Sequence, residues 1–149
     1  MAQVLSINIS KGGIPKLPVD SCLVTFSGLQ GDGRDHEKHI SNDRAVSLID
    51  NEILSRLIEE GYDLCPGAVG ENLTVEQLDV QSLQPRDRLH FSGGVEIELV
   101  ESRRPCFVLD PLGKDLKTDI VGRCGYLARV ITEGTFSTGE SISVIKAVE

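Results

Sequence analysis

The chain has 149 residues, of which 40% are hydrophobic, and a formal net charge of -8 at pH 7. This length can bury one core but leaves little room for two, so we predict a single globular domain over residues 1–149. The acidic balance argues against binding to nucleic acid or to an anionic membrane surface, because both need a basic face. The first residues lack the pattern of a signal peptide and no apolar run reaches the length of a membrane span, so the cytoplasm is the expected location.

The cysteines are widely spaced, and none belongs to a C-x-x-C pair. They are Cys22, Cys65, Cys106 and Cys124. This spacing indicates neither a zinc site nor a small disulfide scaffold, and we expect reduced thiols.

Strand patterns begin the chain, and a helical pattern follows them. Residues 4–9 alternate with period two after the first residue, and residues 22–26 are rich in β-forming side chains. A helical face then follows, with Asp50 as the expected N-cap and Gly61 just past the end. The apolar residues on this face are Ile49, Ile53, Leu54, Leu57 and Ile58.

The clearest local pattern is a hairpin in the second half of the chain. Two alternating runs, residues 88–92 and 95–100, are joined by Gly93-Gly94, which favours a two-residue primed turn. Further on, Asp110-Pro111 is expected to end a strand, and a helical turn is predicted over residues 114–120.

The last strands are predicted at residues 128–132 and 141–145. The connection between them, residues 134–139, has turn composition, so we expect the two strands to pair. Many short strands with one or two helices predict a mainly β fold. We expect a β-barrel-like domain with helical insertions rather than alternating βαβ units.

A glycine-rich connection over residues 28–39 carries two imidazoles, His36 and His39, and runs on to Arg44. The histidines are candidates for metal ligands or proton carriers. Exposed loop histidines without further ligands are also common as plain polar surface, and both interpretations stay open.

A second glycine-rich turn, within residues 65–75, delivers Glu71 and Asn72 at the start of a strand. Glycine allows the backbone to approach a ligand, and an Asn side chain offers both a donor and an acceptor. The alternative is a β-turn in which Asn72 bonds its own backbone. The residues alone do not separate the two interpretations.

Cys106 follows Arg103, Arg104 and Pro105 just after an alternating run. Two guanidiniums beside a thiol favour the thiolate, which attacks electrophiles and binds soft metals. A lone cysteine is also often a small core residue, so the setting of Cys106 supports a reactive role without requiring one.

Further basic residues follow this cysteine. Arg123 and Arg129 are candidates for an anion-binding pocket, because guanidiniums bind oxyanions and phosphates through two parallel hydrogen bonds. They can equally pair with the abundant carboxylates. Cys124 is a candidate resolving thiol for Cys106.

Several motifs occur in a fixed order along nearly the whole chain. They are Gly31-Asp32 with His36 and His39, Arg44-Ala45-Val46-Ser47-Leu48, Pro66-Gly67 with Gly70-Glu71-Asn72-Leu73-Thr74-Val75, Arg104-Pro105-Cys106, and Gly125-Tyr126 with Arg129-Val130 and Gly134. The ordered set resembles the MOSC domain, the family named for the C-terminal domain of molybdenum-cofactor sulfurase. The sequence departs from the usual family pattern at Tyr126-Leu127 and at Gly139-Glu140, which leaves the subfamily open.

The resemblance implies a β-barrel-like fold similar to the pyruvate kinase barrel domain. It also implies that Cys106 carries sulfur as a persulfide or ligates molybdenum. By motif position, the residues expected to grip the molybdenum cofactor (molybdopterin) are Lys11, Arg44, Asn72 and Arg104, and Arg129 joins them as a basic candidate from the residue chemistry.

Function then divides into two main hypotheses. In the first, Cys106 ligates molybdenum and the protein reduces N-hydroxylated substrates with electrons from a separate protein, because the chain has neither a ferredoxin-like cysteine cluster nor a dinucleotide fingerprint. In the second, the chain is a non-catalytic carrier of the cofactor or of a persulfide sulfur, supplied by a separate donor protein. A domain kept only for protein interaction is a weaker third, and the sequence does not fix the oligomeric state.

Overall fold

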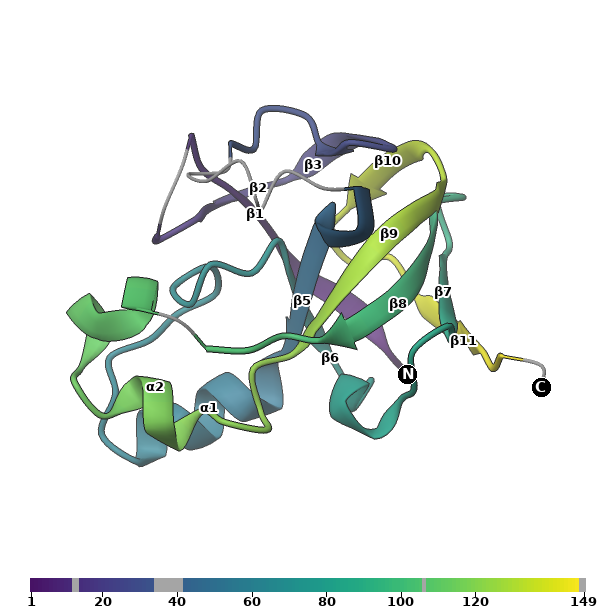
Figure 1. Ribbon diagram of the computed structural model, residues 1–149. Helices are drawn as coiled ribbons and strands as arrows, with labels where there is room; N and C mark the ends of the chain where they lie inside the picture. Colours follow the sequence, from purple (N-terminus) through teal and green to yellow (C-terminus); the bar gives the residue numbers. More distant parts are fainter. Residues whose placement is uncertain (12–13, 34–41, 106, 148–149) are drawn as a thin grey trace.

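The computed structural model describes residues 1–11, 14–33, 42–105 and 107–147, and Figure 1 shows strands on one side and helices at one end. The strands are β1 (Gln3–Ile9), β2 (Leu17–Val19), β3 (Ser21–Thr25), β4 (Gly28–Leu29), β5 (Val46–Asp50), β6 (Leu73–Glu76), β7 (Arg88–Phe91), β8 (Glu96–Ser102), β9 (Tyr126–Thr132), β10 (Gly134–Ser137) and β11 (Ile142–Ile145). The helices are α1 (Asn51–Glu59), α2 (Leu116–Asp119) and the short 3-10 helices η2 (Asn42–Arg44), η3 (Val80–Ser82) and η4 (Phe107–Leu112). The mainly β prediction is confirmed.

The strands form an eight-stranded sheet in the order β11-β7-β8-β9-β5-β6-β1-β2 and a three-stranded sheet in the order β10-β3-β4. The large sheet curls until its edge strand β11 comes back beside β1. An isolated bridge joins Gln3 to Ser141, and the backbone N–H of Val4 donates to Glu140 O at 2.9 Å. We call this contact the seam. Because it is not a continuous ladder, the sheet is barrel-like but not closed.

The predicted hairpin is confirmed as β7 and β8, which pair in antiparallel fashion with Arg88 opposite Glu98. The predicted two-residue turn is wrong. Phe91 N–H donates to Val95 O at 2.9 Å and Gly94 N–H donates to Phe91 O at 2.8 Å, so residues 92–94 form a three-residue loop. Such loops need a left-handed residue at the third position, and Gly94 supplies it with φ +110°.

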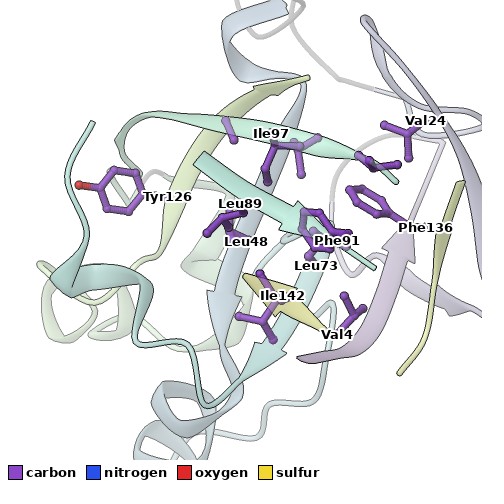
Figure 2. Close-up of a cluster of buried hydrophobic side chains, with 14 of the residues drawn as sticks. Val4, Val24, Leu48, Leu73, Leu89, Phe91, Ile97, Tyr126, Phe136 and Ile142 are labelled. Atoms are coloured by element: carbon purple, nitrogen blue, oxygen red, sulfur yellow. The ribbon is translucent and has the colours of Figure 1, made fainter. Parts of the chain in front are cut away.

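The predicted pairing of the last two strands is also wrong. β9 lies between β8 and β5, whereas β11 pairs with β7. The expected connection between them is itself a strand, β10, because Phe136 is fully buried and draws it against β3. Its ring meets the ring of Phe91 edge to face, with centroids 4.7 Å apart (Figure 2).

β5 is a fully buried strand that the sequence analysis did not predict. It pairs in parallel with β6, and α1 lies in the crossover between them, so the fold contains one βαβ connection where none was expected. Ile49 belongs to β5 rather than to the helix, and Ile58 is 46% exposed. The apolar run before α1 is a strand that is buried on both faces. Such a strand has no alternation of apolar and polar residues by which it could be recognised.

Asp50 precedes α1 as predicted, but its side chain makes no capping hydrogen bond to the helix. Its carboxylate instead accepts hydrogen bonds from the backbone N–H groups of Asp79 at 2.9 Å and Val80 at 2.8 Å. Burial is the main reason that the pKa of Asp50 is raised to about 6. The residue therefore fastens the start of the helix to the connection after β6.

The predicted helical turn over residues 114–120 is confirmed as α2. The segment before it is the 3-10 helix η4 and not a strand ended by Asp110-Pro111. Proline can occupy a short helix of this kind because its fixed φ near -65° is compatible with it.

Two apolar clusters hold the fold together. The larger lies between the sheets, and Figure 2 shows its side chains meeting from both. The smaller packs α1 and α2 against the end of β5, and it receives Val69 from the second glycine-rich turn and Leu109 from η4. The second glycine-rich turn and η4 are therefore both anchored on this smaller cluster. Within the described residues, none of the helices is long and apolar enough to cross a membrane.

Candidate functional site

Cys106 lies outside the described residues, and its position is bounded by the end of β8 at Ser102 and the start of η4 at Phe107. The backbone N–H of Arg103 donates to Gly125 O at 2.8 Å, which holds the exit of β8 beside the start of β9. The predicted reactive cysteine thus follows a strand end whose position is fixed.

The two guanidiniums before Cys106 have different surroundings. Arg103 donates from Nη2 to Val69 O at 2.7 Å, and its Nη1 is buried. Arg104 is exposed, and the described part of the chain gives it no hydrogen bond or ion pair. Arg104 is therefore the guanidinium that is available to a ligand, whereas Arg103 is used inside the protein.

The glycines of the turn over residues 67–70 allow close approach, but to the protein's own backbone. Gly67 has φ +90°, and a Cβ there would collide with the carbonyl of Lys16. The backbone N–H of Lys16 donates to Gly67 O at 2.9 Å. A Cβ on Gly70 would lie 3.2 Å from Arg103 Nη2. This turn packs between the β1–β2 connection and the end of β8.

Glu71 has no exposed surface, and its Oε2 accepts hydrogen bonds from Gly67 N–H at 2.9 Å and Thr74 Oγ1 at 2.6 Å. Burial raises the pKa of Glu71, while these two hydrogen bonds and the charge of Arg103 act in the opposite direction. Glu71, which was predicted at the start of a strand, is therefore fully buried there.

Asn72 is 4% exposed, and each of its side-chain hydrogen-bonding groups has a partner inside the protein. Its Oδ1 accepts from the backbone N–H of Ser47 at 3.0 Å and from the Ser47 hydroxyl at 3.3 Å. Its Nδ2 donates to Asn8 O at 3.3 Å and to Asp32 Oδ2 at 3.0 Å. The amide joins β1, β5 and β6, and cofactor binding by Asn72 stays a prediction that would require one of these bonds to be exchanged.

Asp32 is the second centre of this network. Its Oδ1 accepts from the Lys16 ammonium at 2.6 Å and from the backbone N–H of Ser10 at 3.0 Å. The Lys16 and Asp32 side chains are 11% and 6% exposed, so this is a buried ion pair. Asp32 belongs to a motif that is visible in the sequence, but its ion pair with Lys16 was not predicted. Nothing in the spacing of residues 16 and 32 indicates that they are in contact.

Arg44 is the last residue of η2, just before β5, and Arg129 lies on β9, which pairs with β5. Arg44 pairs with Glu101 at 3.1 Å. Arg129 forms an ion pair with Glu98 and lies 3.9 Å from Asp43. A cavity of about 180 Å³ adjoins them and is lined by Asp43, Arg86, Glu98, Leu99, Val100 and Arg129. Both arginines have carboxylate partners, as the alternative interpretation of the sequence allowed.

The remaining candidates are separate from these groups. Lys11 is exposed and has no side-chain partner in the described ranges, while His36 and His39 lie outside them. Arg123 donates to both carboxylate oxygens of Glu60, at 2.8 and 3.0 Å. Cys124 is 1% exposed in the smaller apolar cluster, and its role as a resolving thiol stays a prediction.

No set of three or more His, Cys, Asp or Glu side chains in the described ranges could hold a metal ion. The different surroundings of Arg103 and Arg104 could not have been found from the sequence, because both follow the end of β8 and the difference comes from the contact of Arg103 with Val69. Arg104 and Lys11 therefore have no side-chain partner among the described residues, whereas Asn72, Arg44 and Arg129 each have at least one.

Comparison with known proteins gives a consistent result. The family model of the MOSC domain matches residues 35–143. A protein called Reductase from Gibberella moniliformis is 34% identical over 89 residues, which cover 57% of this chain and 16% of that protein. The uncharacterized protein YflK of Bacillus subtilis is 29% identical over 171 residues, covering 98% of this chain and 74% of YflK. The chain thus spans only a small part of the fungal protein.

Solved structures show the same fold. YiiM from Geobacillus stearothermophilus superimposes with a TM-score of 0.80 at 26% identity, over 98% of this chain and 76% of YiiM. YUAD protein from Bacillus subtilis also gives a TM-score of 0.80, at 20% identity, over 96% of this chain and 94% of YUAD. With the family model covering most of the chain, these matches identify the protein as a member of the MOSC domain family.

Proposed function

We propose that this MOSC protein binds the molybdenum cofactor, with Cys106 as a ligand of the molybdenum, and reduces N-hydroxylated compounds. The observation that carries the proposal is the exposed Arg104, which lacks a partner in the described part of the chain and stands two residues before Cys106. A thiolate is a soft ligand suited to such a metal, and a neighbouring guanidinium favours the thiolate form. The name of the fungal relative, Reductase, supports a reductive activity.

The candidate cofactor-binding side chains fit the cofactor in part. Arg104 and Lys11 are exposed and uncommitted among the described residues, and they offer the charge and donors that a phosphate requires. Arg44 and Arg129 are held by carboxylates, and the amide of Asn72 is fully used. We therefore assign Arg104 and Lys11 to grip the cofactor. Arg44, Asn72 and Arg129 would engage it only by exchanging their present partners.

The proposed reaction adds two electrons and two protons to an N-hydroxylated compound. The N–O bond breaks, and the products are the N–H compound and water. Molybdenum, when bound, supplies the change of oxidation state, and the protein supplies binding and charge. We propose a separate iron–sulfur or flavin protein as the electron donor, and we place the reaction in the cytoplasm, where thiols stay reduced.

The first test is the molybdenum content of the protein purified from a host that makes the cofactor. We expect near-stoichiometric metal in the unchanged protein and none in Cys106→Ser. The matched control is Cys65→Ser, which changes an exposed cysteine that is not a proposed ligand and should keep the metal. Arg104→Ala should retain less metal than the unchanged protein. Full retention by Cys106→Ser would rule out this cysteine as the ligand.

Activity is measured on the loaded protein with an N-hydroxylated compound and a chemical reductant, which replaces the unknown donor protein. Formation of the N–H product by the unchanged protein but not by Cys106→Ser is expected. Loaded protein that leaves every such compound unreduced would refute the reductase proposal while keeping cofactor binding.

A carrier function is the second candidate, and it is favoured by the absence of any other redox motif in the 149 residues. Here Cys106 would carry a persulfide sulfur received from a donor protein. Intact-mass measurement under non-reducing conditions should then show one added sulfur atom, lost on reduction and absent from Cys106→Ser. Metal-free protein with an unmodified mass would remove this candidate as well.

A further inference from the structure

Two buried side-chain atoms stand out because they have no hydrogen-bond partner in the part of the chain that the structure describes. They are Oε1 of Glu71 and Nη1 of Arg103. One is an acceptor and the other a donor, and the two residues come from segments that pack together. Buried polar groups are nearly always paired, so two complementary unpaired atoms on segments that pack together call for an explanation.

The carboxylate of Glu71 is fixed from one side. Its Oε2 already accepts hydrogen bonds from Gly67 N–H and Thr74 Oγ1, so Oε1 is the oxygen that is left. Both of these hydrogen bonds are donated to Oε2, so Oε1 is the atom that needs one more donor.

The guanidinium of Arg103 is fixed from the other side. Nη2 donates to Val69 O at 2.7 Å and lies 3.2 Å from where a Cβ on Gly70 would be. Val69 and Gly70 are the two residues before Glu71. The charge of Arg103 acts to lower the pKa of the Glu71 carboxylate, against the effect of burial. Yet Nη1 and Oε1 make no direct hydrogen bond with each other. The two side chains therefore belong to segments in contact and their charges interact, but these two atoms do not pair directly.

We infer that one internal water molecule bridges Arg103 Nη1 and Glu71 Oε1, so that the two side chains form a buried, water-separated ion pair. The water accepts a hydrogen bond from Nη1 and donates one to Oε1. Internal waters typically make two to four hydrogen bonds to buried groups that would otherwise be unsatisfied, which is the situation here. The bridge fixes the exit of β8 on the glycine turn, and it commits Arg103 to an internal role while leaving Arg104 outside.

A crystal structure of the unchanged protein at high resolution tests the water directly. We expect one ordered water within hydrogen-bonding distance of both atoms. Direct contact between Nη1 and Oε1, or an apolar side chain between them, would overturn the inference. The result does not depend on molybdenum, so it is independent of the proposed function.

A second test follows the guanidinium in solution by nitrogen-15 NMR of labelled arginine. The Nη–H signals of Arg103, assigned by their loss in Arg103→Lys, should exchange slowly with solvent. In Glu71→Gln, which keeps the shape but removes the charge, exchange should become roughly tenfold faster, as expected for the loss of one charge-assisted hydrogen bond.

The matched control in the same spectra is Arg123, which is paired with Glu60 at a distant, exposed position. Its signals should not change in Glu71→Gln. Rapid exchange of the Arg103 signals in the unchanged protein would contradict the bridge. Equal acceleration of both arginines would also contradict it, because that would show general loosening of the fold rather than loss of a specific partner.

Discussion

Two ion pairs in this protein have the same chemistry but different surroundings. Lys16 and Asp32 are 2.6 Å apart, with side chains 11% and 6% exposed, and Asp32 also serves Ser10 and Asn72. Arg129 pairs with Glu98 and Asp43, but its own side chain is 47% exposed. The first pair is enclosed and shares its oxygens with other buried groups. In the second pair the guanidinium is open to water, and Glu98, although only 9% exposed, also accepts a hydrogen bond from Arg88 Nε at 3.4 Å. The difference teaches that removing one partner should matter far more in the first pair.

The largest effect is expected for Asp32→Ala. This change leaves the Lys16 ammonium, the Ser10 N–H and one N–H of Asn72 without their acceptor. Breaking a buried ion pair by removing one partner typically costs about 3 to 5 kcal/mol, and we expect that loss in the free energy of unfolding measured with urea. A loss below about 1 kcal/mol would mean that the pair behaves like a surface pair and would end the comparison.

Asn72→Ala should be the next most damaging change. It removes hydrogen bonds to Ser47, Asn8 and Asp32, and we expect a loss of about 3 kcal/mol, because several buried groups are left unpaired. Unfolding is compared with and without bound cofactor. If the amide has only its present contacts, the destabilisation should be the same in both states. A loss confined to the loaded protein would show that Asn72 contacts the cofactor.

Asp50 sharpens the comparison as a buried carboxylate that has N–H donors but no ion pair within the described residues. Its pKa is raised to about 6 from 3.8, so the folded protein binds a proton that the unfolded chain has released between these values. The stability from this group is therefore full below about pH 3.8 and falls as pH rises through about 6, by about 3 kcal/mol.

The measurement for Asp50 is the difference in unfolding free energy between the unchanged protein and Asp50→Asn from pH 3 to pH 7. We expect this difference to shift in favour of Asp50→Asn as pH rises, since Asn carries no charge. A constant difference would show that Asp50 titrates normally despite its burial.

The smallest effect is expected for Arg129→Ala. The Arg129 guanidinium is half exposed, and Glu98 keeps its bond to Arg88 when Arg129 is removed, so we expect unfolding to change by no more than about 1 kcal/mol. Urea unfolding at low and high salt checks this, since salt screens exposed pairs. Destabilisation as large as that of Asp32→Ala would contradict the distinction between the two pairs.

Local patterns predicted some elements well and long-range contacts poorly. The β7–β8 hairpin and the turn of α2 depend on neighbouring residues, so alternation and punctuation revealed them. β5 was missed because a strand buried on both faces has no period-two pattern. β10 was missed because its turn-like residues are outweighed by the burial of Phe136 against Phe91, a partner far away in the chain.

The candidate site shows the same limit. Residue types at Arg104 and Asn72 could be read from the sequence, but whether they are free depends on contacts made in space. Asn72 bonds to residues 40 and 64 positions away, and no spacing rule indicates this. Arg104 lacks such partners in the described part of the chain, and Arg103 beside it has Val69. Composition therefore suggested the chemistry, and the fold decides which side chains remain available for it.

The seam between β1 and β11 has a consequence for how the chain folds. The bridge from Gln3 to Ser141 joins residues separated by almost the entire sequence, and Val4 is bonded to Glu140 beside it. Closing a loop of that size has a high entropic cost and comes late, and proteins dominated by such distant pairings fold slowly. During synthesis, the edge of β1 that forms the seam stays unpaired until β11 has left the ribosome. In that interval the exposed edge can pair with other chains.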